Sequence, residues 1–344
     1  MNTSYLEPYL EYLRESPFCN ITYSLIPWIE QIEDNLHWYH MLGNMNATDF
    51  IIRRINPPND HFLRFKLSIH PHPKIIEYLT YHPEIIVWEY LSGNDCALSL
   101  LSENMDNVYW PLFCQNTAAV HILKKYLHKI DWDLLSYNIN AIPILEKHIG
   151  KINWYHLSYN MNAIGILKRY PEKINWDALS RNINAIDLLE ENIDKINWQH
   201  LSGNVNAIRI LKKYPQNIHW KELSANPNAI SLLEQNIDKI SWNHLSSNCN
   251  AIHILRNNVD KINWSILSMN PMAVGILENN IDKINWVSIA RSPGIFTPTY
   301  IYDYGMIRNN KYNLHNEFIQ YMFHPSKIHT LDRLGFTEFS DIIT

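Results

Sequence analysis

The sequence predicts an all-α fold, a superhelical α-solenoid of about twelve 22-residue repeats with two helices in each repeat. Ten of the twelve tryptophans lie on one series with a spacing of 22 residues, from Trp88 to Trp286. The residues around them repeat as D-K-I-N-W-x-x-L-S-x-N-x-N-A-I-x-I-L, most clearly over residues 194–208 and 238–252. Helices this short hold only when they pack on neighbours, so the repeats are expected to stack.

The composition is that of a globular chain without a membrane partner. The 344 residues are 46% hydrophobic and 18% charged, and no run approaches the roughly 20 apolar residues of a membrane span. A net charge of −5 does not favour a phosphate-binding surface. The first residues lack a basic stretch followed by an apolar core, so no secretory signal is expected. Four cysteines without CxxC spacing argue against a disulfide framework or a zinc ribbon and indicate a reducing, intracellular compartment.

Residues 1–33 are expected to form an N-terminal helical cap. The apolar residues Ile26, Trp28, Ile29 and Ile32 have the spacing of an amphipathic helix. A cap is needed because the terminal repeat of an open stack would otherwise expose its apolar face.

The repeats themselves are expected to cover residues 34–296. Trp38 opens a first repeat that is six residues out of phase, and Lys66 takes the Trp position of a degenerate second repeat. The six extra residues are assigned to an insertion near residues 56–61, where the sequence is rich in turn formers.

Each repeat is expected to begin with a short helix that starts at the Trp. The Asn, Asp or Ser directly before the Trp is a favoured N-cap, and Trp154 and Leu157 share one face of the helix. The Asn six residues after the Trp, Asn160 in this repeat, is predicted to end the helix in a left-handed conformation.

A second Asn, two positions later, is predicted to cap the second helix. In the repeat of Trp154 this residue is Asn162, and Ala163 and Leu167 then contribute to a broad apolar face. The Trp, the Ile before it and these apolar positions are expected to form the core. The small residue four after the Trp, usually Ser and once Cys114, suits a close approach of helices.

Charge alternates along the array at the position 14 residues after the Trp. The residues there are Lys124, Glu146, Lys168, Glu190, Lys212, Glu234, Arg256 and Glu278. Equivalent residues of stacked repeats lie about one helix diameter, ~10 Å, apart, so these charges are expected to pair along the stack. A solvated face with pairs worth ~0–1 kcal/mol is the alternative.

Residues 297–344 are expected to form a C-terminal helical cap. Leu314, Phe318, Met322 and Phe323 recur there with helical spacing. The segment contains no recognisable pair of nucleophile and base, so an enzyme hidden in it has little support.

The repeat resembles the short tandem repeats found in many copies in the genomes of giant double-stranded DNA viruses, the nucleocytoplasmic large DNA viruses. Residues 220–240, WKELSANPNAISLLEQNIDKI, carry the W-x-x-L-S-x-N-P-N-A-I-x-L-L-E pattern of that family, and NEFIQYMFHPSKI at residues 316–328 resembles its tail. The resemblance implies a viral protein of the host cytoplasm or the virion. The same repeat is loosely similar to the leucine-rich variant repeat, in which α and 3₁₀ helices alternate.

No catalytic, cofactor-binding or metal site is expected. The chain contains only nine Gly and no Walker loop, GxGxxG, GxSxG or HExxH motif, so it is predicted not to be an enzyme. His156, His200 and His244 recur in alternate repeats, which places them too far apart to share one zinc ion.

The run His70, Pro71, His72, Pro73 is the best local group for a metal. His72, however, falls at the first Asn position of the degenerate repeat. A structural substitution is therefore the preferred interpretation.

A working surface is expected at positions that the repeat does not fix, which are one, two and five residues after the Trp. In the middle of the array these are Tyr155, His156, Tyr159, Asp177, Arg181, Gln199, His200, Lys221, Glu222, Asn243 and His244. Mixed charge with Tyr and His is typical of a protein-binding face, whereas a base-reading solenoid repeats stacking and basic residues in every unit. Ordinary solvent-exposed surface is the alternative.

The sequence therefore predicts a non-enzymatic scaffold for protein–protein interaction, without a cofactor and with a protein partner that it does not identify. A solenoid that binds single-stranded nucleic acid and a purely structural virion component are the alternatives.

Overall fold

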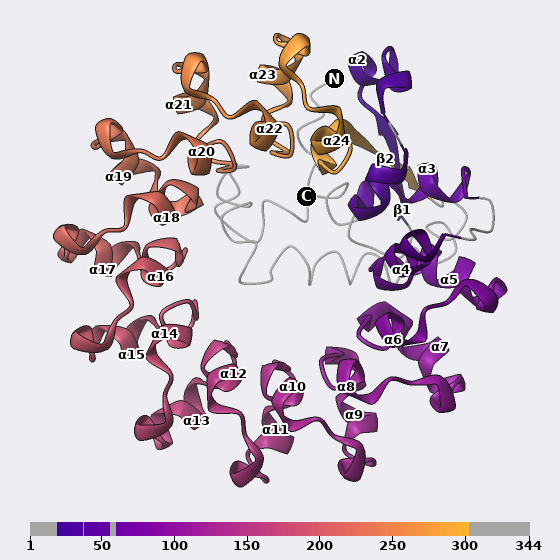
Figure 1. Cartoon of the computed structure of the whole chain (residues 1–344), viewed down its shortest axis with the longest axis vertical. Helices are drawn as coiled ribbons and strands as arrows, with labels where there is room; N and C mark the ends of the chain where they lie inside the picture. Colours follow the sequence, from indigo (N-terminus) through magenta and orange to yellow (C-terminus); the bar gives the residue numbers. More distant parts are fainter. Residues whose placement is uncertain (1–18, 37, 56–59, 303–344) are drawn as a thin grey trace, which may run out of the picture. The chain divides into compact units, whose positions relative to one another are not determined.

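The computed structural model describes residues 19–36, 38–55 and 60–302, and the chain divides into two units. One unit, Pro27–Ile295, is an array of short helices (Figure 1). In the other unit, the described residues form a two-stranded antiparallel sheet of β1 (Cys19–Leu25) and β2 (Phe296–Tyr302). The predicted all-α repeat solenoid is therefore confirmed for the first unit.

The array of helices in Pro27–Ile295 consists of two rows, with one row inside the other (Figure 1). The inner row consists of Trp helices, all of which except α4 begin at the Trp position: η3 (Trp38–Gly43), α4 (His61–Ile69), α6 (Trp88–Leu91), α8 (Trp110–Phe113), α10 (Trp132–Tyr137), α12 (Trp154–Tyr159), α14 (Trp176–Leu179), α16 (Trp198–Gly203), α18 (Trp220–Ala225), α20 (Trp242–Leu245), α22 (Trp264–Leu267) and α24 (Trp286–Ile289). The outer row consists of second helices: α3 (Thr48–Ile52), α5 (Pro73–Tyr81), α7 (Leu98–Glu103), α9 (Val120–Leu123), α11 (Ile142–Leu145), α13 (Ile164–Arg169), α15 (Ile186–Glu190), α17 (Ile208–Lys213), α19 (Ile230–Glu234), α21 (Ile252–Arg256) and α23 (Val274–Glu278).

Short 3₁₀ helices link the second helix of one repeat to the Trp helix of the next, an element that the two-helix prediction lacked. They are η5 (Pro83–Ile85), η7 (Met105–Asn107), η9 (Leu127–Lys129), η10 (Ile149–Lys151), η11 (Pro171–Lys173), η12 (Ile193–Lys195), η13 (Pro215–Asn217), η15 (Ile237–Lys239), η16 (Val259–Lys261) and η17 (Ile281–Lys283). Other 3₁₀ turns are η2 (Glu33–Asn35), η4 (Met45–Ala47), η6 (Asp95–Ala97), η8 (Thr117–Ala119), η14 (Pro227–Ala229) and η18 (Pro293–Ile295). No helix among the described residues could cross a membrane by its length and apolarity.

Helical caps at residues 1–33 and 297–344 are a wrong prediction where the structure describes these segments. β1 and β2 pair with Leu25 opposite Phe296 and Cys19 opposite Tyr302. Their Ile, Thr and Tyr residues favour strands. In the N-terminal segment only α2 (Pro27–Glu30) and the first residue of η2 are helical among the described residues, and the helical spacing noted around Phe318 falls on residues that the structure does not describe.

The Asn six residues after the Trp cross-links neighbouring repeats. Asn160 is extended, with φ −67° and ψ 112°, rather than left-handed as predicted. Its Nδ2 donates to the carbonyls of Ser136 and Asn138 in the preceding repeat, at 3.2 and 3.0 Å, while its Oδ1 accepts from the N–H of Asn162 at 3.0 Å. The side-chain amide is thus fully used by main-chain groups, which favours the extended conformation over the left-handed one.

The same pair of inter-repeat bonds recurs along the array, and we call this set the asparagine ladder. Its members with two bonds to the preceding repeat are Asn94, Asn116, Asn138, Asn160, Asn182, Asn204, Asn226 and Asn248. All are 5% exposed or less. A buried amide that satisfies main-chain carbonyls fixes the register between repeats as well as stabilising them.

The second Asn does not cap the second helix, contrary to the prediction. α13 has Ala163 at its N-cap, without a side-chain bond. Asn162 instead donates from Nδ2 to the carbonyl of Ile139 in the preceding repeat, at 3.0 Å. The Ser position adds a further link, because Ser136 Oγ accepts from the N–H of Asn153 in the next repeat at 3.0 Å.

The N-cap before the Trp is confirmed in six of the seven repeats that carry Asn, Asp or Ser there, and only Ser241 forms no cap bond. Asn153, for example, accepts from the N–H of His156 at 3.2 Å. The core prediction is confirmed at positions such as Leu157 and Leu167, which are fully buried.

The tryptophans from Trp88 to Trp286, by contrast, are only half-buried, so their assignment to the core is wrong. Trp154 packs at its ring against Tyr170, with 5.4 Å between the centroids. In repeats without this Tyr a Lys covers the ring instead, as Lys195 Nζ does 4.7 Å from the centroid of Trp176. The Trp therefore stacks with polar side chains at the border of the core.

The first and last repeats of this unit are joined by the bonds that join successive repeats. Asn44, at the ladder position, donates from Nδ2 to the carbonyls of Ala290 and Ser292 at 3.2 and 2.8 Å. Asn46, at the second Asn position, donates to the carbonyl of Pro293 at 3.3 Å. The whole array of repeats is therefore a closed ring, not an open superhelix. Its first and last repeats cover each other without a cap.

The second repeat is shifted relative to the prediction, with Arg64 rather than Lys66 at the Trp position. Ser68 Oγ donates to the carbonyl of Arg64 at 3.0 Å and accepts from the N–H of Val87 at 2.9 Å, which are the bonds of the Ser position. His70, not His72, consequently occupies the ladder position. Its side chain is 2% exposed, and neither ring nitrogen has a hydrogen-bond partner among the described residues.

Restoring the ladder by the substitution His70→Asn should stabilise the protein and flatten its pH dependence. The new amide could donate to the first repeat, at about 1 kcal/mol per bond. Burial lowers the pKa of His70 from 6.5 to about 4. The unfolded state therefore binds more protons between these values, so stability is present above pH 6.5 and is lost as the pH falls towards 4.

Urea unfolding at pH 7 and pH 5 checks this prediction. Between pH 7 and pH 5 the free energy of unfolding of the wild type should fall by about 2 kcal/mol because of His70. In the His70→Asn variant this contribution should be absent. The control is His121→Asn, the same substitution at an exposed position outside the ladder, which should not reproduce the effect of His70→Asn. Equal losses in wild type and His70→Asn would contradict the assignment.

Candidate partner-binding surface

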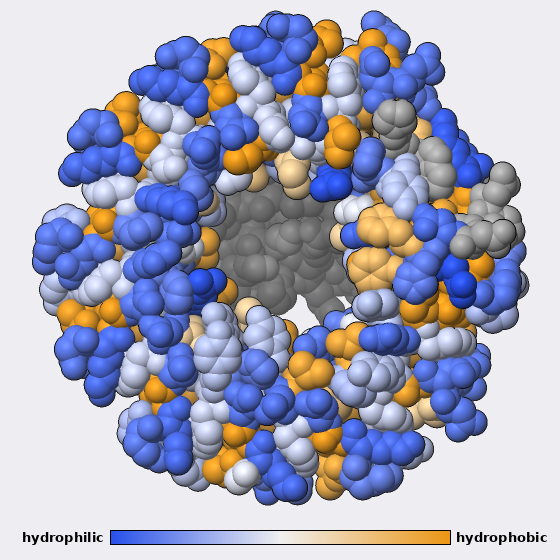
Figure 2. Space-filling model, in the orientation of Figure 1, coloured by the Kyte–Doolittle hydropathy of each residue, from blue (hydrophilic) through white to orange (hydrophobic). Residues whose placement is uncertain are grey.

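The predicted surface residues lie on consecutive Trp helices from α12 to α20, except for Arg181, which lies two residues after the end of α14. Those that are exposed are Tyr155, Asp177, Arg181, Gln199, Lys221 and Asn243, and those that are partly buried are His156, Tyr159, His200, Glu222 and His244. The structure thus places them in one row along the inner helices, because the same positions after the Trp recur on the same side of each repeat. Figure 2 shows a mainly hydrophilic face of the molecule, on which apolar residues form small separate groups.

Three tyrosines and a histidine gather at one part of this row, and we call them the Tyr cluster: Tyr137, Tyr155, His156 and Tyr159. The rings of Tyr155 and Tyr159 meet edge to face with centroids 5.4 Å apart, and a hydrogen bond with Tyr155 raises the pKa of Tyr159. Tyr137 is 51% and Tyr155 47% exposed. Tyr137 was missed from the sequence, although its position five residues after Trp132 could have indicated it.

A pocket of about 280 Å³ lies between the repeats of α14, α16 and α18, which follow the repeat of α12 in the array. The predicted residues Arg181, Gln199, His200 and Glu222 line it. Gly203, which the sequence interpretation missed, contributes open space because it has no side chain at a position where other repeats carry Tyr or Arg. We call this cavity the Arg181 pocket.

Two histidines of the row are fixed to the main chain. The imidazole Nδ1–H of His156 donates to the carbonyl of Asp133 at 2.8 Å, and that of His200 donates to the carbonyl of Asp177 at 3.0 Å. Both bonds reach the preceding repeat. These histidines therefore have a structural role and a rigid orientation at the surface.

Arg181 connects the pocket to the Tyr cluster. It lies five residues after Trp176, the position that Tyr159 holds in the preceding repeat, and it lines the pocket. Within the part of the chain that the structure describes, Arg181 forms no ion pair. An unpaired guanidinium beside exposed tyrosines is well suited to bind a carboxylate in two contacts.

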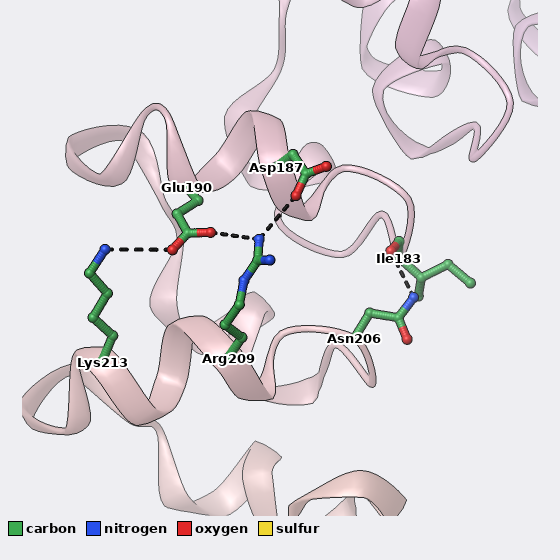
Figure 3. Close-up of polar contacts among 6 residues, drawn as sticks. All are labelled: Ile183, Asp187, Glu190, Asn206, Arg209 and Lys213. Atoms are coloured by element: carbon green, nitrogen blue, oxygen red, sulfur yellow. Dashed lines mark hydrogen bonds and ion pairs between the residues drawn. The ribbon is translucent and has the colours of Figure 1, made fainter.

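The alternating charges do not pair with one another, so the predicted ladder of ion pairs is wrong in its partners. Glu190 lies 2.6 Å from Arg209 Nη2 and 3.5 Å from Lys213 Nζ, and Arg209 also contacts Asp187 (Figure 3). Glu146 pairs with Arg169 in the next repeat. Glu146 and Glu190 thus pair with basic residues on the second helix of the following repeat, at positions close to the predicted ones, where the long side chains can reach them.

The described residues include no group of three or more His, Cys, Asp or Glu side chains that could hold a metal ion. His72, at the centre of the best candidate run, accepts from the N–H of Lys74 at 3.2 Å and acts as an N-cap. Cys114 is fully buried, as expected for a small core residue. Burial raises the pKa of its thiol to about 11, which makes it a poor nucleophile.

No protein-family model, curated protein or solved structure matches this chain.

Proposed function

We propose that the ring is a non-enzymatic scaffold that binds a protein partner through the Tyr cluster and the Arg181 pocket. The observation that carries this proposal is that the repeats with the exposed Tyr137 and Tyr155 are followed directly by the repeat of Arg181. Arg181 lines a concave site and has no ion pair among the described residues. Tyr and Arg are the residues most often found at the energetic centres of protein interfaces. Because rigid helices present them, little ordering entropy is lost on binding.

A protein partner agrees better with the charges than single-stranded nucleic acid does. Asp133, Asp177 and Glu222 belong to the same row of positions and would repel phosphates. Between α10 and α20 the tyrosines at these positions are confined to two adjacent repeats, whereas a solenoid that reads bases uses stacking residues in each repeat. An acidic and partly apolar peptide, with a carboxylate on Arg181, satisfies both features.

The resemblance to giant-virus repeat proteins supports a setting in the host cytoplasm or the virion. In this setting the partner would be a host protein or another virion component. A purely structural virion role would need no pocket, and it is the outcome if the surface can be altered without consequence.

Binding assays with surface variants test the proposal. Tyr155→Ala and Arg181→Ala should each reduce recovery of a crosslinked partner about tenfold or more, as expected for residues at the centre of an interface. Tyr81→Ala on α5, where Tyr81 is 75% exposed, and Arg256→Ala on α21 are matched controls that should retain the partner. Equal recovery with all four variants, or binding of single-stranded RNA that depends on Tyr155, would contradict a protein-binding role for this surface.

A further inference from the structure

A second pocket, of about 410 Å³, lies where the first repeats of the array meet the last repeats. Tyr39, Phe62 and Lys66 line it from the first two repeats, and Met269 and Arg291 line it from the last two. We call it the seam pocket. It exists only because the ring is closed, since its walls come from opposite ends of the array.

Among the described residues that line this pocket, each one with a permanent charge is positive. Lys66 and Arg291 form no ion pair among the residues that the structure describes. Two cations that face one cavity repel each other and attract an anion, above all a phosphate with several oxygens. The size is also within the range of small-molecule sites, which are typically ~300–1,000 Å³.

Another part of the wall of the seam pocket is formed by two aromatic rings. The rings of Tyr39 and Phe62 are stacked, with centroids 5.3 Å apart and an interplanar angle of 25°. The Tyr39 hydroxyl donates to Asp60 at 2.6 Å, which orients the ring and raises the pKa of Tyr39 to about 12, so the ring stays uncharged. Phe62 is 45% exposed, and an exposed aromatic face of this kind binds planar rings by stacking.

We infer that the seam pocket binds a planar aromatic ring that carries phosphate, of the size of a nucleoside mono- or diphosphate. The ring stacks on Phe62 and Tyr39, and the phosphate lies between Lys66 and Arg291. Since these two cations belong to opposite ends of the array, the bound anion stabilises the closed ring. By linkage, a substitution that weakens the contacts between the first and last repeats lowers the affinity for the ligand.

Calorimetric titration at low ionic strength tests the site with AMP, ADP, adenosine, inorganic phosphate and a 5′-phosphorylated oligonucleotide. AMP or ADP should bind in a 1:1 complex, and adenosine and phosphate alone should each bind about tenfold more weakly or worse, because each lacks half of the contacts. A higher affinity for the oligonucleotide than for AMP would identify the source of the ring and phosphate as a nucleic-acid end.

Charge-removing variants locate the binding. Lys66→Gln and Arg291→Gln should each weaken AMP binding about tenfold or more, whereas Lys212→Gln and Arg256→Gln on second helices should leave it unchanged. Absence of binding to wild type, or an unchanged affinity in both seam variants, would overturn the inference.

Coupling to ring closure is tested at a residue outside the pocket. Gly294→Ala, which disturbs the closing repeat, should weaken AMP binding severalfold relative to Gly275→Ala, a substitution in open space. Equal affinities in these two variants would refute the coupling, while the charge variants would still decide on the site itself.

Discussion

Replacing Asn160 by Ala should lower the free energy of unfolding by about 3–5 kcal/mol, which is a large share of the stability of an ordinary domain. The substitution leaves the carbonyls of Ser136 and Asn138 and the N–H of Asn162 without partners in the interior. Each buried polar group without a partner costs about 1–3 kcal/mol. Urea unfolding followed by circular dichroism measures the loss.

Two further variants separate the hydrogen bonds from the volume of the side chain. Asn160→Asp keeps the shape but cannot donate while ionised, and it points a carboxylate at two carbonyls, so it should destabilise at least as much as Ala. Asn162→Ala removes one exposed bond, to Ile139, and should cost about 1 kcal/mol or less. If Asn160→Ala were no more harmful than Asn162→Ala, the ladder would not be the main link between repeats.

Gly294→Ala should destabilise the closing repeat by about 2–3 kcal/mol. A Cβ at Gly294 would overlap the main-chain carbonyl and Cα of Pro271 in the preceding repeat, and main-chain atoms cannot rotate away. Gly294 lies in η18, next to Ser292 and Pro293, whose carbonyls bind the first repeat. Opening of the ring should therefore accompany the loss of stability.

Hydrogen–deuterium exchange measures this opening as faster exchange of amides in η18 and α3. Gly275 on α23 is the control, because a Cβ there meets nothing within 4 Å. Gly275→Ala should stabilise by about 0.5–1 kcal/mol, since Ala is the better helix former. Slower or unchanged exchange in η18 and α3 of Gly294→Ala would show that the substitution does not open the ring.

Much of the repeat could be predicted from the sequence because its signals are local. The N-cap role of Asn153 depends on an N–H three residues away. The burial of Leu157 and Leu167 follows from helical spacing around one Trp. The exposure of six of the eleven predicted surface residues, such as Tyr155 and Lys221, follows for the same reason, since one repeat is enough to place them.

The roles of the paired asparagines could not be predicted because one amide can serve several purposes. Asn160 could have ended a helix, and Asn162 could have capped one, with equal local plausibility. Their donors instead bind carbonyls 22 to 24 residues earlier in the chain. Which role is taken depends on where the preceding repeat lies, and a single repeat contains no information about this.

The sequence by itself determined the 22-residue period, the start of the Trp helices and most of the core, because propensity, capping and periodicity act over a few residues. Only the tertiary structure decided that the array closes. Closure depends on small rotations that add up over all repeats until Asn44 meets Ala290 and Ser292, 246 and 248 residues away. The Arg181 pocket and the seam pocket were also decided by the tertiary structure, since the wall of each pocket is assembled from side chains of different repeats.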